Sequence, residues 1–306
     1  MPPTRHLLPI GHPAAPKAQP LKTRYDSRSM TIAAGFLVQN GILLCADTQY
    51  TSGTKIHKAK LFPGTFGSSL SVVFALAGND GYGRMAIEDA KQAISSIPVA
   101  ERSVSRITFA VREAVKIIDE EYVCKRPPNE IEGSRFELLM ALRHQEEGLR
   151  LFSIRHTFLV PVDSHECIGI GEYLAGYLIG AYKKDTSKKQ AAIMAARMLS
   201  ALKSYDANCG GFSQIIVLRS DGTFSPSKWY ESHVEDIHIP EFERLTRDLL
   251  SHVADVEMDD LEFQRHLESF SKHISELRES WKQEAGKWAL AAVFVEAMED
   301  GSTSSE

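Results

Sequence analysis

The sequence predicts an α+β protein in which two antiparallel sheets lie between layers of helices. Its 306 residues read, in order, as four strands, two helices, several strands, two helices and two strands, followed by a helical end. This order lacks the strict strand–helix–strand repeat that a parallel sheet needs. Short turns such as Asn40-Gly41 instead join neighbouring strands as hairpins. Amphipathic helices that come in pairs would then cover the outer faces of the sheets.

The first four strands follow from apolar patterning. Apolar residues alternate with other residues up to the Asn-Gly turn, as in a half-buried strand. The next run is continuously apolar, which is typical of a strand buried on both faces, and it ends at Asp47. A Gly-rich turn separates the third strand from the fourth. The expected strands span residues 34–38, 42–46, 58–62 and 70–77.

The pattern then changes to helical spacing. Asn79 or Asp80 is the expected N-cap of the first helix, and Pro127-Pro128 is expected to stop the second. The expected helices span 79–97, 103–123, from Gly169 or Gly171 to about Tyr182, and 187–205. Further strands are expected at 135–143, at 148–154, near Leu159, and in a hairpin at 210–224 that turns at Asp221-Gly222.

The two ends of the chain differ from this central part. Residues 1–30 are rich in proline and basic residues and lack the apolar segment of a secretory signal. They are interpreted as a disordered tail, as a removable leader, or as the result of a start codon assigned too far upstream, with Met30 as the initiator. Residues 225–306 read as a helical extension whose apolar stripes form a packing face or an oligomer contact. The central domain is expected to span residues 31–224.

Composition excludes several classes of function. The net charge of −5 provides no basic footprint for nucleic acid, and no apolar run approaches the ~20 residues of a membrane span. The four cysteines are widely spaced and form no CxxC pair, so neither a zinc site nor a disulfide framework is expected, and the cytoplasm is the expected compartment. "GNDGYG" lacks the Lys-Ser/Thr of a P-loop, and there is no HExxH or GxSxG motif. We expect no metal and no cofactor.

One group of residues indicates a catalytic site. Thr31 stands at the start of a strand, Asp47 ends its hairpin partner, and Lys60 lies on the next expected strand. A threonine hydroxyl needs a base, which a free amine on the same residue can supply. A nearby lysine lowers the pKa of that amine through like charge, and an aspartate can hold the lysine in place. Taken alone, Thr31 is also an ordinary strand former, Asp47 an ordinary turn residue and Lys60 an ordinary surface charge.

The stretch from Thr31 to Phe62 resembles the opening of proteasome β-type subunits and of the bacterial HslV peptidases, which are N-terminal nucleophile (Ntn) hydrolases. "GILLCADTQYTSG" follows the family pattern, and Asp47 lies sixteen positions after the threonine (47 − 31 = 16). "FALAGNDGY" resembles the family strand that ends in Ala-Gly before the first helix. "YDANCGGFSQIIVLRSDG" resembles the family's D-x-x-S-G-G segment and the hairpin after it.

This resemblance implies a four-layer αββα fold and a threonine-type endopeptidase that acts on polypeptides. Thr31 would be the nucleophile, with its own amine as the base. Asp47 would orient Lys60, Asp206 would support the threonine, and Gly78 would stabilise the oxyanion. Because the connecting loop is shorter here, Lys58 is the alternative lysine. The substrate-binding and supporting positions implied are Thr51, Leu76, Cys209, Gly210 and Ile170, where Cys209 and Ile170 replace serines of the family.

The resemblance also implies a homo-oligomer or ring, with any unfoldase partner left open. Self-processed members of the family carry glycine before the threonine, whereas Met30 stands there in this chain. Removal of an initiating Met30 would expose Thr31 without self-cleavage. Two alternatives stay open. One is a catalytically inactive structural subunit of the same fold, and the other is an Ntn amidase that acts on small amides.

Overall fold

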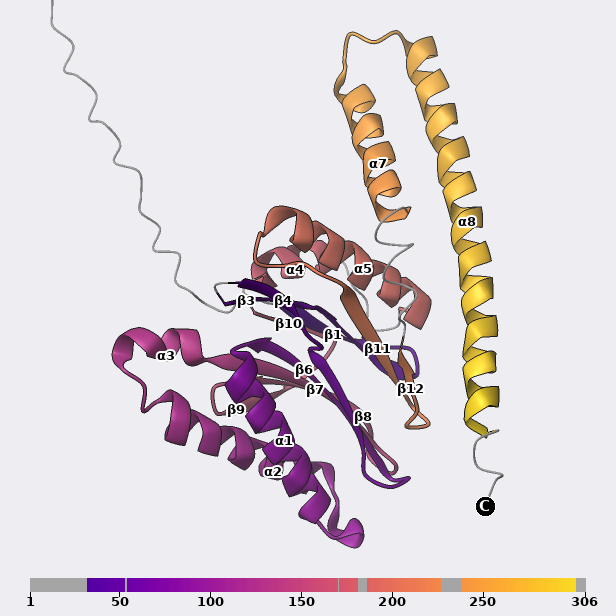
Figure 1. Cartoon of the computed structure of the whole chain (residues 1–306). Helices are drawn as coiled ribbons and strands as arrows, with labels where there is room; N and C mark the ends of the chain where they lie inside the picture. Colours follow the sequence, from indigo (N-terminus) through magenta and orange to yellow (C-terminus); the bar gives the residue numbers. More distant parts are fainter. Residues whose placement is uncertain (1–31, 53, 170, 181–185, 227–237, 301–306) are drawn as a thin grey trace, which may run out of the picture.

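The computed structural model describes residues 32–52, 54–169, 171–180, 186–226 and 238–300. It is an α+β protein with several antiparallel sheets, as the sequence predicts (Figure 1). The first five-stranded sheet has the order β10-β1-β2-β11-β12, and the second has the order β5-β6-β7-β8-β9. The first consists of β10 (His165–Gly169), β1 (Ile32–Val38), β2 (Gly41–Asp47), β11 (Ser213–Arg219) and β12 (Phe224–Pro226). The second consists of β5 (Leu61–Thr65), β6 (Leu70–Gly78), β7 (Phe136–His144), β8 (Gly148–Arg155) and β9 (Phe158–Val162).

The two sheets face each other across a core of small and branched side chains. Because successive residues of a strand point to opposite faces, each strand contributes every second residue to this core. Ala33 of β1 and Leu44 of β2 meet Val73 of β6 and Leu139 of β7 there, and all four are buried. This core packs the two sheets against each other.

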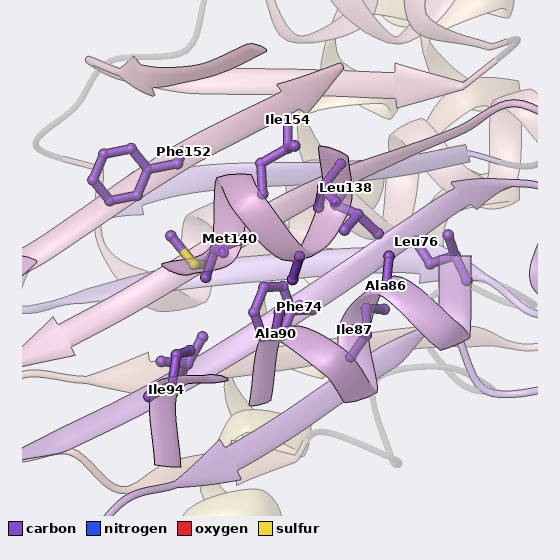
Figure 2. Close-up of a cluster of buried hydrophobic side chains, with 14 of the residues drawn as sticks. Phe74, Leu76, Ala86, Ile87, Ala90, Ile94, Leu138, Met140, Phe152 and Ile154 are labelled. Carbon is purple, nitrogen blue, oxygen red and sulfur yellow. The ribbon is translucent and has the colours of Figure 1, made fainter. Parts of the chain in front are cut away.

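Helices cover the outer face of each sheet. The pair α1 (Asp80–Ser96) and α2 (Val104–Ile118) buries its apolar stripe on the second sheet, where Ile87 and Ala90 of α1 lie near Phe74 and Met140 (Figure 2). Asn79 caps α1 by accepting a hydrogen bond from the amide nitrogen of Tyr82 at 3.1 Å. On the first sheet, α4 (Glu172–Ile179) and α5 (Lys188–Tyr205) bury an apolar face against β1 and β2.

Four short elements are absent from the sequence prediction. These are the hairpin of β3 (Gln49–Ser52) and β4 (Thr54–His57), the edge strand β10, and the helix α3 (Pro128–Ser134). Pro127-Pro128 therefore not only stops the preceding helix but also starts a new one, because proline fits the first turn of a helix. The expected third strand is also shifted, since β5 begins at Leu61 and Lys60 precedes it. In addition, α2 is followed by a π-helical turn at Asp119–Val123.

The described residues 238–300 form two helices, α7 (Ile239–Ala254) and α8 (Asp260–Asp300), which pack against each other (Figure 1). The apolar segment at 288–298 is part of α8. Within the described part of the chain, no helix combines the length and the apolar character that crossing a membrane requires. The domain boundaries at residues 30 and 224, and the cytoplasmic location, stay predictions.

Candidate active site

Asp47 is the last residue of β2, and its carboxylate is fully buried. Its Oδ1 accepts a hydrogen bond from the amide nitrogen of Ile32 at 3.3 Å, and its Oδ2 accepts one from the amide nitrogen of Gly210 at 3.0 Å. Oδ1 also forms an ion pair with Nζ of Lys60. One carboxylate thus joins the first residue of β1, the loop before β11 and the lysine before β5.

Lys60 is also fully buried, although it carries a long charged side chain. Besides Asp47, its Nζ donates to the backbone oxygen of Gln49 at 2.7 Å and lies 4.6 Å from the centre of the Tyr50 ring. Burial lowers the pKa of Lys60, while the Asp47 carboxylate opposes this change. The ammonium group is therefore held where it loses its proton more readily than a surface lysine does.

The backbone on both sides of Lys60 is fixed by other strands. Its amide nitrogen donates to Oε1 of Gln214 at 2.7 Å, and its backbone oxygen accepts from the amide nitrogen of Leu76 at 3.0 Å. Gln214 belongs to β11 of the first sheet, whereas Leu76 belongs to β6 of the second. Lys60 thus lies at the point where the two sheets meet, which explains why its side chain can reach Asp47.

Lys58, the alternative lysine, faces another way. Its Nζ forms an ion pair with Oδ2 of Asp80 at 2.7 Å, and its side chain is 45% exposed. Asp80 also binds Nε of Arg84 at 2.5 Å. Of the two lysines that the sequence left open, Lys60 is therefore the one in contact with Asp47.

The loop that follows α5 brings three predicted residues near this pair. The backbone of Gly210 binds both Asp47 and Gln49. Cys209 is buried, and burial together with the nearby Asp47 carboxylate raises the pKa of its thiol to about 12. The carboxylate of Asp206 accepts hydrogen bonds from the backbone and the side chain of Asn208, both at 2.9 Å, and so stabilises its own loop.

Gly78 and Leu76 lie at the end of β6, close to Lys60 in the sheet. Gly78 has a φ of +89°, and a Cβ there would stand 2.6 Å from the backbone oxygen of Arg135, so only glycine fits this position. It lines a cavity of about 310 Å³ together with Glu137, Gly169 and Glu172. The side chain of Leu76 is fully buried in the core beneath α1, so it does not line the surface of a substrate site.

Some predicted positions cannot be placed from the structure. Thr31 and Ile170 lie outside the described residues. Thr51 is described by its backbone, which pairs with Lys55 in the small β3–β4 hairpin. The residues that flank the first two are described, however. Ile32 follows Thr31 in the chain and pairs with Gly169, which precedes Ile170.

Several polar residues of this site were not found by the sequence analysis. Gln49, Tyr50 and Gln214 surround Lys60, and Nζ of Lys203 donates to Oγ of the buried Ser213 at 2.6 Å. Ser213 faces Asp47 in the β2–β11 register. A polar residue inside an expected strand was the available signal for Ser213 and Gln214. Lys203 lies on a helix among other surface-type residues and gave no signal.

The same part of the molecule offers no evident place for a metal ion. Among the residues that the structure describes, no three histidine, cysteine, aspartate or glutamate side chains are grouped in a way that could hold one. The site instead contains a buried carboxylate and a buried ammonium group next to the start of a strand. Such an arrangement can fix a positive charge close to the backbone of Ile32.

The sequence matches no family model and no curated protein. Several solved structures do have a similar fold. A glycine mutant of Anbu from Hyphomicrobium sp. strain MC1 has a TM-score of 0.62 and 14% identity, with 75% of this chain and 99% of that chain covered. Anbu, described as an ancestral beta-subunit, from Yersinia bercovieri has a TM-score of 0.60 and 15% identity over 74% and 98% of the two chains. The helical assembly of the Anbu complex from Pseudomonas aeruginosa has a TM-score of 0.60 and 16% identity over 75% and 98%.

These matches correct the sequence assignment. The specific assignment to proteasome β-type subunits or HslV peptidases is wrong, because the similar solved structures are Anbu proteins. Anbu proteins are proteasome-like relatives with the Ntn fold, so the broader prediction of a proteasome-like Ntn fold is supported. At identities of 14–16%, this similarity shows the fold alone.

Proposed function

We propose that this protein is a threonine-type peptidase with a proteasome-like Ntn fold of the Anbu kind. The observation that carries the proposal is the buried Asp47–Lys60 pair, whose carboxylate also binds the amide nitrogen of Ile32. Thr31 is the residue directly before Ile32 in the chain. A buried, paired lysine with a lowered pKa at the start of a strand is a typical feature of a functional site.

The proposed fold is a four-layer αββα sandwich. Support comes from three separate apolar cores, one between the two sheets and one beneath each helix pair. In such a fold the buried pair lies at one end of the inner core, where strands of both sheets converge. We expect the nucleophile at this edge, where an extended polypeptide would reach it.

In the proposed reaction, Oγ of Thr31 attacks the carbonyl carbon of a peptide bond. The Thr31 amine takes the hydroxyl proton through a water molecule and later gives it to the leaving amine, so an acyl ester and a free amine result. Water then cleaves the ester and restores the hydroxyl group. The positive charge of Lys60 lowers the pKa of the Thr31 amine, and Asp47 fixes the position of Lys60.

Further residues would assist this reaction. The backbone N–H of Gly78 would stabilise the oxyanion, a contribution that is often worth ~3 kcal/mol for one donor. Thr51 would bind the substrate backbone by strand addition. Asp206 would support Thr31 through its loop. Cys209 and Ile170 stand where serines are expected, so we expect a low turnover.

We further propose that the protein forms a homo-oligomer. The Anbu complex from Pseudomonas aeruginosa is described as a helical assembly, which supports self-association in proteins of this fold. The exposed helix pair α7–α8 offers additional surface for such contacts. The substrate class we propose is the polypeptide, and an unfoldase partner stays a prediction.

The mechanism requires a free amine on Thr31, because an amide nitrogen is not basic. The decisive experiment therefore compares the full chain with a shorter chain that starts at Met30 and loses this methionine. Mass spectrometry identifies the N-terminal residue, and a peptide library measures hydrolysis. We expect hydrolysis, and covalent capture by a threonine-directed epoxyketone, only where Thr31 is the first residue.

Thr31→Ala should abolish both signals, whereas the matched control Thr246→Ala on α7 should keep them. Thr246 is exposed and hydrogen-bonds only within its own helix in the described structure. If the chain with a free Thr31 hydrolyses no peptide in the library, the structural-subunit hypothesis replaces the proposal. Cleavage of small amides alone would favour the Ntn amidase instead.

A further inference from the structure

The edge strand β10 is held from outside by two side chains of the other sheet. Among the described strands of the first sheet, β10 pairs with β1 alone, so the groups on its outer edge need other partners. The amide nitrogen of Gly169 donates to Oε2 of Glu137 on β7 at 2.9 Å. The backbone oxygen of Cys167 accepts from Nη2 of Arg155 on β8 at 2.8 Å. Side chains thus take the place of a neighbouring strand at two outward-facing positions, Cys167 and Gly169.

Arg155 also connects both sides of the turn that leads from β10 into α4. Its Nη2 lies 2.9 Å from Oε1 of Glu166 and 2.8 Å from Oε2 of Glu172, and its Nη1 lies 3.9 Å from Oε1 of Glu137. Partial burial disfavours its charge, but these three carboxylates outweigh this effect and raise the pKa of Arg155. We call Glu137 and Arg155 with these contacts the β10 bracket.

The bracket acts on the residue that pairs with the start of β1. Gly169 is the register partner of Ile32, and its φ of +94° marks the beginning of the turn. On the other side, Glu137 directly follows Phe136, which is the register partner of Gly78. A chain of contacts therefore runs from Gly78 through β7 and Glu137 to Gly169 and then to Ile32.

We propose that Glu137 and Arg155 are positioning residues that set the distance between the start of β1, where Thr31 precedes Ile32, and the backbone of Gly78. This inference rests on the proposed function, because it gives Thr31 and Gly78 the roles of nucleophile and oxyanion donor. The two groups belong to different sheets, and Glu137 and Arg155 of the second sheet bind the backbone of β10 directly. The β10 bracket therefore links the two sheets next to the start of β1.

The expected consequence is a selective loss of turnover. A misplacement of about 1 Å between reacting groups can cost ~100-fold in rate. Substrate binding by backbone pairing elsewhere is not affected by such a shift. Glu137→Ala should therefore lower kcat about 10-fold to 100-fold and leave KM within about twofold.

Glu137→Gln is the conservative variant that separates positioning from general destabilisation. Its amide oxygen can still accept the hydrogen bond from Gly169, so kcat should stay within about threefold of the original protein. Arg150→Met is the matched control for Arg155→Met. Arg150 lies on the same strand, β8, and is exposed, and the contact described for it is with the backbone of Leu149. Arg155→Met should lower kcat, and Arg150→Met should not.

Hydrogen exchange of the full chain provides a readout that does not depend on activity. In Glu137→Ala, amide exchange should become at least ~10-fold faster at Gly169 and at the β1 amides that pair with β10, and exchange in β6 should stay unchanged. Glu137→Gln should retain the protection. If Glu137→Ala changes neither exchange nor kcat, or if Ala and Gln lower kcat equally, the positioning role is wrong. If the chain with a free Thr31 has no activity at all, the proposed function fails, and the exchange result alone decides whether the bracket holds Gly169.

Discussion

Lys58 and Lys60 are two residues apart, and each forms an ion pair with an aspartate, yet the two pairs are physically different. Lys60 and Asp47 both have side chains with 0% exposure, whereas the side chain of Lys58 is 45% exposed and that of its partner Asp80 is 16% exposed. The Tyr50 ring lies near both ammonium groups, with centroid distances of 4.6 Å to Lys60 and 6.0 Å to Lys58.

The difference shows what a buried pair is suited for. An exposed pair is screened by water and contributes little to stability. A buried pair loses hydration on both partners, so replacing it with apolar residues is often neutral or stabilising. Asp47 and Lys60 compensate this loss with backbone contacts to Ile32, Gly210 and Gln49. We infer that the buried pair holds a positive charge in a fixed position, and that the exposed pair helps to anchor the start of α1.

The largest effect is expected for Lys60→Met. This change leaves the Asp47 carboxylate buried without its cation, which typically costs about 3–5 kcal/mol. We expect chemical denaturation to show a loss of this size in the free energy of unfolding, together with the loss of peptide hydrolysis. Lys58→Met is the matched control. An equal loss in the two variants would show that burial does not distinguish the pairs.

Asp47→Asn should have the next largest effect, about 2–3 kcal/mol, because one of the two backbone donors loses its acceptor and Lys60 loses its counter-ion. Lys60 can respond by releasing its proton, since burial already lowers its pKa. A lysine whose pKa is lower in the folded than in the unfolded state makes stability rise with pH below the unfolded value of about 10.4. The deficit of Asp47→Asn should therefore be larger at about pH 6 than at about pH 9. Denaturation at both pH values tests this, and a deficit that grows with pH would contradict it.

Asp80→Asn should have a smaller effect with a different pH dependence. Burial acts to raise the pKa of Asp80, but hydrogen bonds from Lys58 and Arg84 lower it below the ordinary value of 3.8. A carboxylate with a lowered folded-state pKa contributes stability above the unfolded value, and this contribution is lost as the pH falls through the folded-state pKa. We expect a deficit of about 1 kcal/mol or less at pH 7 that vanishes in acid. A deficit that persists unchanged in acid would contradict the assignment to this charge.

The smallest effect is expected for Lys58→Met by itself. Arg84 still binds Asp80 after the change, and an exposed pair contributes about 0–1 kcal/mol. The free energy of unfolding should change by about 0.5 kcal/mol or less, and activity should stay the same. A strong loss of hydrolysis in this variant would give Lys58 a role in the chemistry and would weaken the distinction between the two lysines.

Strong local signals in the sequence were sufficient for much of the fold. The Asn40-Gly41 turn, the apolar run that ends at Asp47 and the cap at Asn79 predicted β1, β2 and α1 in their observed places. The edge strand β10 was missed, because its existence depends on a partner far away in the chain. The strand β10 is defined by its pairing with β1, which lies more than a hundred residues earlier.

The candidate site divides in the same way. The sequence by itself determined which residue types were available, including a threonine before a strand, an aspartate at the end of its partner and two nearby lysines. Only the tertiary structure decided that Lys60 meets Asp47 while Lys58 meets Asp80. It also brought Gln214, Lys203 and Glu137 to the site from distant elements. The physical reason is that charge and hydrogen-bonding capacity belong to single residues, whereas burial and the distance between two groups arise when separate strands pack together.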